Sequence, residues 1–533
     1  MGLLLPRRAM PVNRRFLGGA VLLSAAGLLS RVFGLYRLAL PSLLGPVGVG
    51  LYHMAYPVYA LALAVSTGGL PVAISKLVAD RVARAEHGEA RRVVLVSLAV
   101  LAPLGAAMAA ALYLGAPEIA REVARDPKAA MSIRAIAPAV FLVAVMSVLR
   151  GYHQGYQDMV PTALSQLVEQ AVRVGTLVAL VVLLAPRGVA AQAAGAASGA
   201  VAGALAGMLV LFALGGRRSG ISAETFPGAF STRLPALVRE IVALALPVTV
   251  AGLAIPLMQL GDLAMVPARL AQVGVATAQR TALYGELSGY ATPIANLPSV
   301  VTFAIAVALV PAVAEAGRGE RMADAKERIE AALRAAGMVA MPAALGLVVL
   351  GPALMTSLFA SPEAGRLLTI LGPSIFFLGL VQVTTGALQG LDRASWPVRN
   401  IFLGVALKFA LTWWLLPPFG VAGAAMATAS GYFFAAVLNL IDLKRVLGRL
   451  PSLRSVAVRP ATGLPFLALF ALLGVRLGGE GGAGAALTGV GAGAVGYLLG
   501  LLLLGGISDA DMSALPGGAF LRRALTGLGL WRG

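Results

Sequence analysis

The chain has 533 residues and no cysteine, and 59% of its residues are hydrophobic while only 12% are charged. Soluble globular proteins carry about 25% charged residues. This chain has too few charged residues to cover the surfaces of soluble domains, which indicates an all-α polytopic membrane protein. The lack of cysteine excludes disulfides, thiolate metal sites and cysteine nucleophiles. The net charge of +19 is not arranged as a basic stripe interleaved with aromatics, which argues against a nucleic-acid partner.

A helix that crosses a bilayer needs about 20 mostly apolar residues. The sequence offers fourteen such stretches, at 16–40, 50–77, 93–115, 131–152, 161–185, 188–214, 236–266, 286–314, 330–350, 366–389, 397–416, 420–442, 457–475 and 484–506. If the N-terminus is cytoplasmic, 29 of the 42 basic residues fall in inside segments and 8 in outside loops. This asymmetry follows the positive-inside rule and predicts that both termini are cytoplasmic.

An internal repeat organises these spans into two lobes of six. Ala137–Leu142 matches Gly372–Phe377 at an offset of 235, later matches have an offset of 232, and Pro71–Ala73 matches Pro311–Val313 at 240. Since six is even, the repeat is parallel, and two such lobes around a central substrate site are a transporter plan. The predicted parts are a cytoplasmic N-terminus (1–15), an N-lobe (16–214), a cytoplasmic linker (215–235), a C-lobe (236–442), a cytoplasmic loop (443–456), two further spans (457–506) and a cytoplasmic tail (507–533).

Charged side chains inside the spans are costly and usually face a cavity or a partner. Arg31 and Arg37 stand in the first span without an acidic neighbour, and Arg31 is far from either end. We expect Arg31 to be a cavity cation. Arg37 is also placed to reach the outer interface by snorkelling.

Glu169 and Arg173 are four residues apart, so they share a helix face and can pair. Lys408 stands at the repeat-equivalent position of Arg173, and no acid is near it in its own span. We expect Lys408 to line the cavity or to face the other lobe. Asp262, an acid deep in its span, is a candidate partner for Lys408 or for a coupling cation.

An interior with more fixed cations than anions suits an anionic substrate, and the arginine fork suits phosphate in particular. A pump for cationic drugs is expected to show the opposite balance. The sequence has no phosphate-binding P-loop, no HExxH, no GxSxG and no acidic metal cluster. We therefore predict a transporter that is not an enzyme, with no catalytic residues, no metal site and no cofactor.

Three segments resemble the stage V sporulation protein B family of polysaccharide transporters: residues 66–77, 149–174 and 282–289. This family belongs to the multidrug/oligosaccharidyl-lipid/polysaccharide (MOP) exporter superfamily and is related to the MurJ lipid II flippases. The resemblance implies a fourteen-helix fold in which the last two spans line a groove for a lipid tail. It also implies that the motif Ser-Arg-x-x-Gly-x-x-Arg, here residues 30–37, places Arg31 and Arg37 against the pyrophosphate of the substrate.

The sequence departs from the flippase pattern at several points. MurJ flippases carry an acid after the second arginine, where this chain has Leu38, and an arginine in the next span, where residues 60–64 are apolar. Some relatives bind sodium through an acid one turn after an asparagine. Here the residue one turn after Asn400 is Gly404.

Asp262, Asn400 and Thr428 are the candidates for a remaining cation site. The alternative is that Lys408 itself supplies the positive charge. The coupling therefore stays open between Na⁺, H⁺ and the membrane potential.

The resemblance implies a flippase for lipid II in a bacterial plasma membrane, with membrane lipids around it and cell-wall synthesis enzymes as candidate partners. Arg173 and Lys408 are second candidates for binding the pyrophosphate. Three alternatives remain: a flippase for another undecaprenyl-pyrophosphate-linked polysaccharide, a drug/cation antiporter of the same superfamily, and a non-transporting cell-wall scaffold.

Overall fold

The computed structural model describes residues 40–506 apart from 216–233, 318–321, 450, 453 and 480–481. Within these ranges every regular element is a helix, because apolar segments in lipid must satisfy their backbone groups internally. Twelve helices are long and apolar enough to cross a membrane, and the count is thirteen if one bent pair forms a single span. Each corresponds to one of the predicted spans. The first predicted span, at 16–40, lies outside the described residues except for Leu40, so the total of fourteen stays a prediction.

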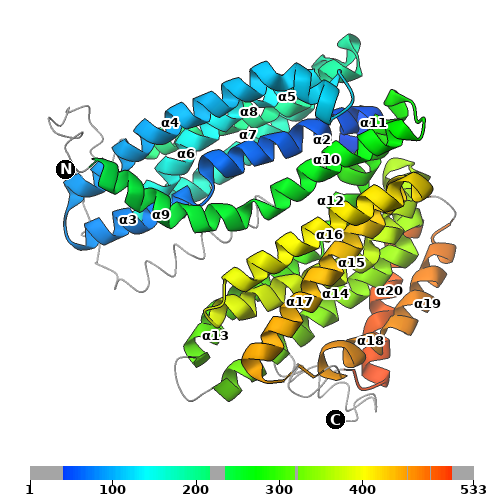
Figure 1. Ribbon diagram of the computed structural model, residues 1–533. Coiled ribbons are helices and arrows are strands. Elements are labelled where there is room, and N and C mark those ends of the chain that lie inside the picture. The colour runs from blue at the N-terminus through cyan, green and yellow to red at the C-terminus, as the bar shows by residue number, and fades with distance from the viewer. Residues whose placement is uncertain are drawn as a thin grey trace, which may run out of the picture. The chain divides into compact units, whose positions relative to one another are not determined.

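Contacts divide the chain into two compact units between Ala264 and Met265. The long helices of the first unit come from the predicted N-lobe, with the first half of the bent pair added (Figure 1). Its helices are α2 (Leu40–Thr67), α3 (Leu70–Ala83), α4 (His87–Glu118), α5 (Ala129–Ile136), α6 (Pro138–Gly155), α7 (Val160–Leu183), α8 (Val189–Gly215) and α9 (Leu234–Gly252).

The second predicted span is broken into α2 and α3 at a glycine pair. Gly69 has a φ of +68°, a conformation that glycine adopts without a steric penalty. Thr249 of α9 donates a hydrogen bond to the Gly68 carbonyl, and a Cβ at Gly68 would lie 2.9 Å from the Thr249 methyl. The break therefore lets α9 approach the backbone of α2 closely.

The bent pair is α9 followed by α10 (Ala254–Gln272), which meet at an angle of 53°. Within the first unit, α9 packs on α3 and α4, and Arg81 forms an ion pair with Glu240 at 3.0 Å. The division between the units falls inside α10. The linker predicted at 215–235 lies almost wholly outside the described residues.

The second unit holds the remaining helices. They are α11 (Thr277–Gly285), α12 (Thr292–Asn296), α13 (Ser299–Gly317), α14 (Met322–Phe359), α15 (Pro362–Gly390), α16 (Ser395–Phe419), α17 (Val421–Leu447), α18 (Arg459–Ala461), α19 (Leu464–Leu477) and α20 (Ala483–Leu503). The span predicted at 286–314 begins only at Ser299. Pro293 and Pro298 interrupt the helical hydrogen bonds there, and short helices precede the span.

The last two spans, α19 and α20, form a hairpin beside α14 (Figure 1). Glycines let the two helices approach each other closely. A Cβ at Gly474 would lie 2.5 Å from the Thr488 carbonyl oxygen, and one at Gly496 would lie 2.6 Å from that of Phe466. Small residues at the contact are the usual device of helix packing in membranes.

The repeat recurs in the packing of both units, with one correction. A Cβ at Gly151 of α6 would lie 3.0 Å from the Pro71 carbonyl oxygen, and one at Gly386 of α15 would lie 2.5 Å from that of Ala306. Both steps equal 235 residues, so Pro71 corresponds to Ala306. The sequence match of Pro71 with Pro311 was therefore wrong by five residues, because a short apolar match is not specific in such a composition.

Candidate functional site

Arg31 and Arg37, the main sequence candidates, lie outside the described residues. Four of the other candidates lie at two polar clusters, one in each unit: Glu169 and Arg173 in the first, and Asn400 and Lys408 in the second. The cluster in the first unit lies among α6, α7 and α8, and the cluster in the second unit lies among the repeat-equivalent helices α15, α16 and α17.

Glu169 anchors the cluster in the first unit. Arg150 of α6 forms an ion pair with it at 2.9 Å and also donates to the Ser165 hydroxyl at 2.8 Å. The two charged side chains are only 16% and 14% exposed. The sequence offered Arg173, one turn further along the same helix, as a candidate partner for Glu169. The structure shows an ion pair with Arg150, which joins α6 to α7.

Arg173 is half-buried one turn after Glu169, within hydrogen-bonding reach of the buried Tyr59 of α2. A row of glycines on α8 makes room for both charged residues. A Cβ at Gly203 would lie 2.5 Å from the Glu169 carbonyl oxygen, and one at Gly199 would lie 2.8 Å from that of Arg173. The close approach of α8 fixes the backbone from which these side chains extend.

Lys408 of α16 is buried, with an exposed fraction of 1%. It lies at a close contact between α16 and α17, since a Cβ at Gly404 would lie 2.7 Å from the Gly431 carbonyl oxygen. A Cβ at Gly431 would in turn lie 3.0 Å from the Lys408 Cβ. The two helices therefore leave no space for a side chain at Gly404.

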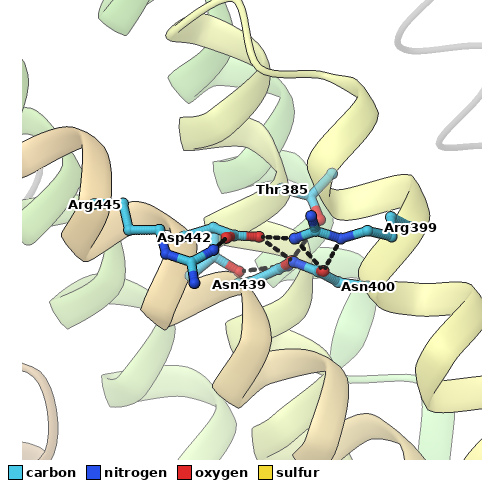
Figure 2. A network of polar contacts seen from close by, with 7 residues as sticks. Thr385, Arg399, Asn400, Asn439, Asp442 and Arg445 are labelled. Atoms are coloured by element: carbon cyan, nitrogen blue, oxygen red, sulfur yellow. Dashed lines mark hydrogen bonds and ion pairs between the residues drawn. The ribbon is translucent and has the colours of Figure 1, made fainter.

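Asn400 lies one turn before Gly404, in a hydrogen-bonded network that Figure 2 shows. Its amide donates to the Asp442 carboxylate at 2.8 Å and to the Asn439 side chain at 2.9 Å. Arg399 donates to Asp442 at 2.6 Å, and Arg445 donates to the other carboxylate oxygen at 2.9 Å. The network joins α16 to α17.

Asn439 extends the network to the third helix. Its amide donates to the Thr384 hydroxyl of α15 at 3.0 Å and lies 3.4 Å from that of Thr385. Asn400, Asn439 and Thr384 are all fully buried. The polar groups therefore satisfy one another in a dry environment, where an unpaired group would be costly.

The two clusters occupy equivalent places in the repeat. At the repeat offset of 235 residues, Asn400 corresponds to Ser165, Thr385 to Arg150 and Lys408 to Arg173. In each unit, one polar cluster therefore joins neighbouring helices, and a basic residue lies two turns further along the same helix. The repeat offset already paired Arg173 with Lys408, but the residue types at the other positions differ, so the sequence matches did not indicate the rest of this correspondence.

The structure places Thr428 away from Asn400. The Thr428 hydroxyl donates to the Ala424 carbonyl of its own helix at 2.9 Å. Asn400 instead contacts Asn439, which lies about 16 Å further along α17 at the helical rise per residue. Asp262 is half-buried in α10. Among the described residues, no group of three or more His, Cys, Asp or Glu side chains has the arrangement of a metal site.

Sequence reasoning missed several members of both clusters. Arg150, Arg399 and Arg445 lie near span ends, and counting them as loop charges hid their interactions. Asp442 carried a usable signal, because it is the only acid between Val421 and Leu447 and an arginine follows it by three residues. A lone acid in an apolar span needs a partner.

A separate polar contact lies outside the helices that are long enough to cross a membrane. Glu286, in the short π-helical turn Glu286–Ala291, accepts a hydrogen bond from the Ser361 hydroxyl at 2.8 Å. Burial raises the pKa of this carboxyl above its ordinary value, the nearby Glu363 acts in the same direction, and the hydrogen bond opposes them. Ser361 also caps α15 by accepting from the Ala364 amide. This contact therefore ties the turn to the start of α15.

Two family models match the chain. The model described as polysaccharide biosynthesis protein matches residues 16–317, and the MatE model matches residues 287–414. The chain is 30% identical to stage V sporulation protein B of Bacillus subtilis (strain 168), over 82% of this chain and 85% of that protein. It is 26% identical to the lipid II flippase MurJ of the same organism, over 82% of this chain and 84% of that protein.

Solved structures show the same fold at low identity. An inward-facing multidrug resistance MATE family transporter of the MOP superfamily matches with a TM-score of 0.67 and 16% identity, over 81% of this chain and 98% of that one. The inward closed conformation of lipid II flippase MurJ matches with a TM-score of 0.65 and 13% identity, over 90% and 98%. The chain therefore belongs to the polysaccharide biosynthesis protein family, and it is a multi-pass membrane transporter of the MOP superfamily, related to stage V sporulation protein B and MurJ, in a bacterial cell membrane.

Proposed function

We propose that this transporter is a flippase that moves lipid II, a lipid-linked peptidoglycan precursor, from the inner to the outer leaflet. The observation that carries the proposal is the pair of basic residues at equivalent interior positions of the two units, Arg173 and Lys408. Pyrophosphate is anionic, and a cation held in a low-dielectric interior attracts it more strongly than one in water. The relationship to MurJ and stage V sporulation protein B supports a lipid-linked saccharide as the substrate class.

In the proposed mechanism, the two lobes alternate access to a central cavity. The pyrophosphate, sugar and peptide pass through this cavity, while the polyprenyl chain stays in lipid beside α19 and α20. Arg31 and Arg37 hold the pyrophosphate, with Arg173 and Lys408 as second contacts.

The proposal is tested in a bacterium depleted of its own lipid II flippase. We expect this protein to restore lipid II to the outer leaflet, and we expect Arg31→Ala and Lys408→Ala to abolish the rescue while membrane insertion stays normal. Lys444→Ala, which removes an exposed lysine beside Arg445, is the matched control and should rescue.

Failure of the well-inserted wild-type protein would contradict lipid II as the substrate, and another undecaprenyl-pyrophosphate-linked saccharide would then be assayed. Full rescue by Arg31→Ala would contradict the cavity assignment. A drug/cation antiporter would instead raise resistance to cationic drugs. A scaffold for cell-wall enzymes would tolerate the loss of Arg31.

A further inference from the structure

The arginines around Asp442 have more hydrogen-bonding capacity than their partner can use. The Asp442 side chain is only 2% exposed, whereas those of Arg399 and Arg445 are 53% and 64% exposed. One oxygen of Asp442 receives Arg399 and Asn400, and the other receives Arg445. A single buried carboxylate therefore holds two guanidinium groups near each other at the surface.

On α16 and α17 themselves, the charges of this network do not balance. Two arginines face one carboxylate, α16 contains no acid, and Asp442 is the only acid in α17. Arg399 uses Nε and Nη2 in its hydrogen bonds, and Arg445 uses Nη1. Within the part of the chain that the structure describes, Nη1 of Arg399 and Nη2 of Arg445 have no hydrogen-bond partner. These groups are donors available to an anion.

Apolar side chains lie beside the two arginines on the membrane side. Leu403 follows Arg399 by four residues on α16 and is 45% exposed. Ile441 precedes Arg445 by four residues on α17 and is 42% exposed. Residues four apart share a helix face, and both apolar residues lie one turn deeper into the span than their arginine. Each helix thus presents a cation at its end and an apolar surface beneath it.

We propose that Arg399 and Arg445 form a binding site for the phosphate of a membrane lipid, with its chains along Leu403 and Ile441. Each remaining guanidinium nitrogen can donate a charge-assisted hydrogen bond to a phosphate oxygen. Asp442 and Asn400 hold the guanidinium of Arg399 in place, so little side-chain freedom is lost on binding. The site lies at the end of the helices that is predicted to face the cytoplasm.

This inference does not rest on lipid II as the substrate, because ordinary phospholipids carry the same chemical group. The two sources of the phosphate are a bilayer phospholipid and a polyprenyl diphosphate. The two lipids differ in the head group, a phosphate in one and a diphosphate in the other, and in their chains. Direct competition between them therefore distinguishes the two sources.

The experiment measures lipid retention by the purified full-length protein with native mass spectrometry. The probes are phosphatidylglycerol, undecaprenyl diphosphate and a monoglucosyl diacylglycerol, which has similar chains but no phosphate. We expect the phosphate lipids to be retained and the glycolipid to be lost. We expect Arg445→Gln to weaken retention about tenfold, as loss of a charged hydrogen bond does, and Arg399→Gln/Arg445→Gln to weaken it further.

Lys444→Gln is the matched control, because it removes an exposed cation beside Arg445 that makes no contact with Asp442 among the described residues. Equal weakening by Lys444→Gln and Arg445→Gln would overturn the site in favour of diffuse surface charge. Equal retention of the glycolipid would overturn phosphate recognition. If the double variant misfolds, Arg445→Gln still tests the site, because Arg399 and Asn400 keep Asp442 paired. Displacement of phosphatidylglycerol by undecaprenyl diphosphate would support the site and assign it to the polyprenyl lipid, and the reverse preference would support it as a phospholipid site.

Discussion

At the scale of single residues, the first unit depends on one nearly buried ion pair. Removing one partner of a buried pair leaves an uncompensated charge, whereas replacing both partners with apolar residues is often tolerated. Arg150 and Glu169 are both largely shielded from solvent, and Ser165 supplies an additional hydrogen bond. The pair therefore makes a specific contribution to the stability of the α6–α7 contact.

We predict that Glu169→Ala lowers the stability of the purified protein by about 3 kcal/mol, measured as a fall in the midpoint of thermal unfolding. Glu118→Ala is the control, because its partner Arg121 is 56% exposed and Glu118 itself is 68% exposed. Exposed pairs contribute about 1 kcal/mol or less. Equal effects of the two variants would show that burial does not strengthen the Arg150–Glu169 pair.

The sequence alone identified some of the interacting charged residues and missed others. The spacing of Glu169 and Arg173 indicated a charged helix face, and the repeat connected Arg173 to Lys408. It could not identify Arg150 as the ion-pair partner, because side chains on one helix do not reveal which neighbouring helix supplies a charge. The pairing of Arg399 with Asp442 was missed for the same reason, as it depends on the rotation of α16 against α17.

At the scale of helices, glycine decides which neighbours can approach. The contact between α16 and α17 places Gly404 and Gly431 against each other's backbone, and this contact lies between Asn400 and Lys408. In the sequence, Gly404 stands out only because it is not an acid. The structure gives it a packing role, which a single sequence cannot show without the partner helix.

We predict that Gly404→Ala destabilises the protein by about 1–3 kcal/mol, as overpacking does, because its Cβ would meet a carbonyl oxygen that cannot move alone. Gly404→Asp should be worse. Thermal unfolding of the purified variants measures this. Gly346→Ala in α14 is the control, since its Cβ would meet no atom within 4 Å among the described residues. A Gly404→Ala variant as stable as Gly346→Ala would contradict the close contact.

At the scale of the whole molecule, composition and the hydrophobic stretches predicted the fold well. Thirteen predicted spans have counterparts in the described residues, because length and apolarity alone define a crossing helix. The internal breaks were not predicted. They depend on Gly69, Pro298 and the bend after α9, where local backbone geometry matters more than hydrophobicity.

We predict that transport does not require sodium. No side chain fits at Gly404, Asn400 is held by Asn439 and Asp442, and Lys408 already places a positive charge in the interior. Rescue or reconstituted flipping should proceed at the same rate when Na⁺ is replaced by K⁺ at constant ionic strength. A rate that falls severalfold without sodium would contradict this and would restore a cation site including Asp262.

The position of the tryptophans has a practical consequence. The chain has four, and Trp396, Trp413 and Trp414 all lie on α16, while Trp531 lies outside the described residues. The ring of Trp413 is covered by Arg269 at 4.0 Å, and Trp414 is 75% exposed. In a Trp531→Phe background, all intrinsic tryptophan fluorescence therefore comes from the helix that carries Arg399, Asn400 and Lys408. This helix contains its own optical reporter, with Trp396 only three residues from Arg399.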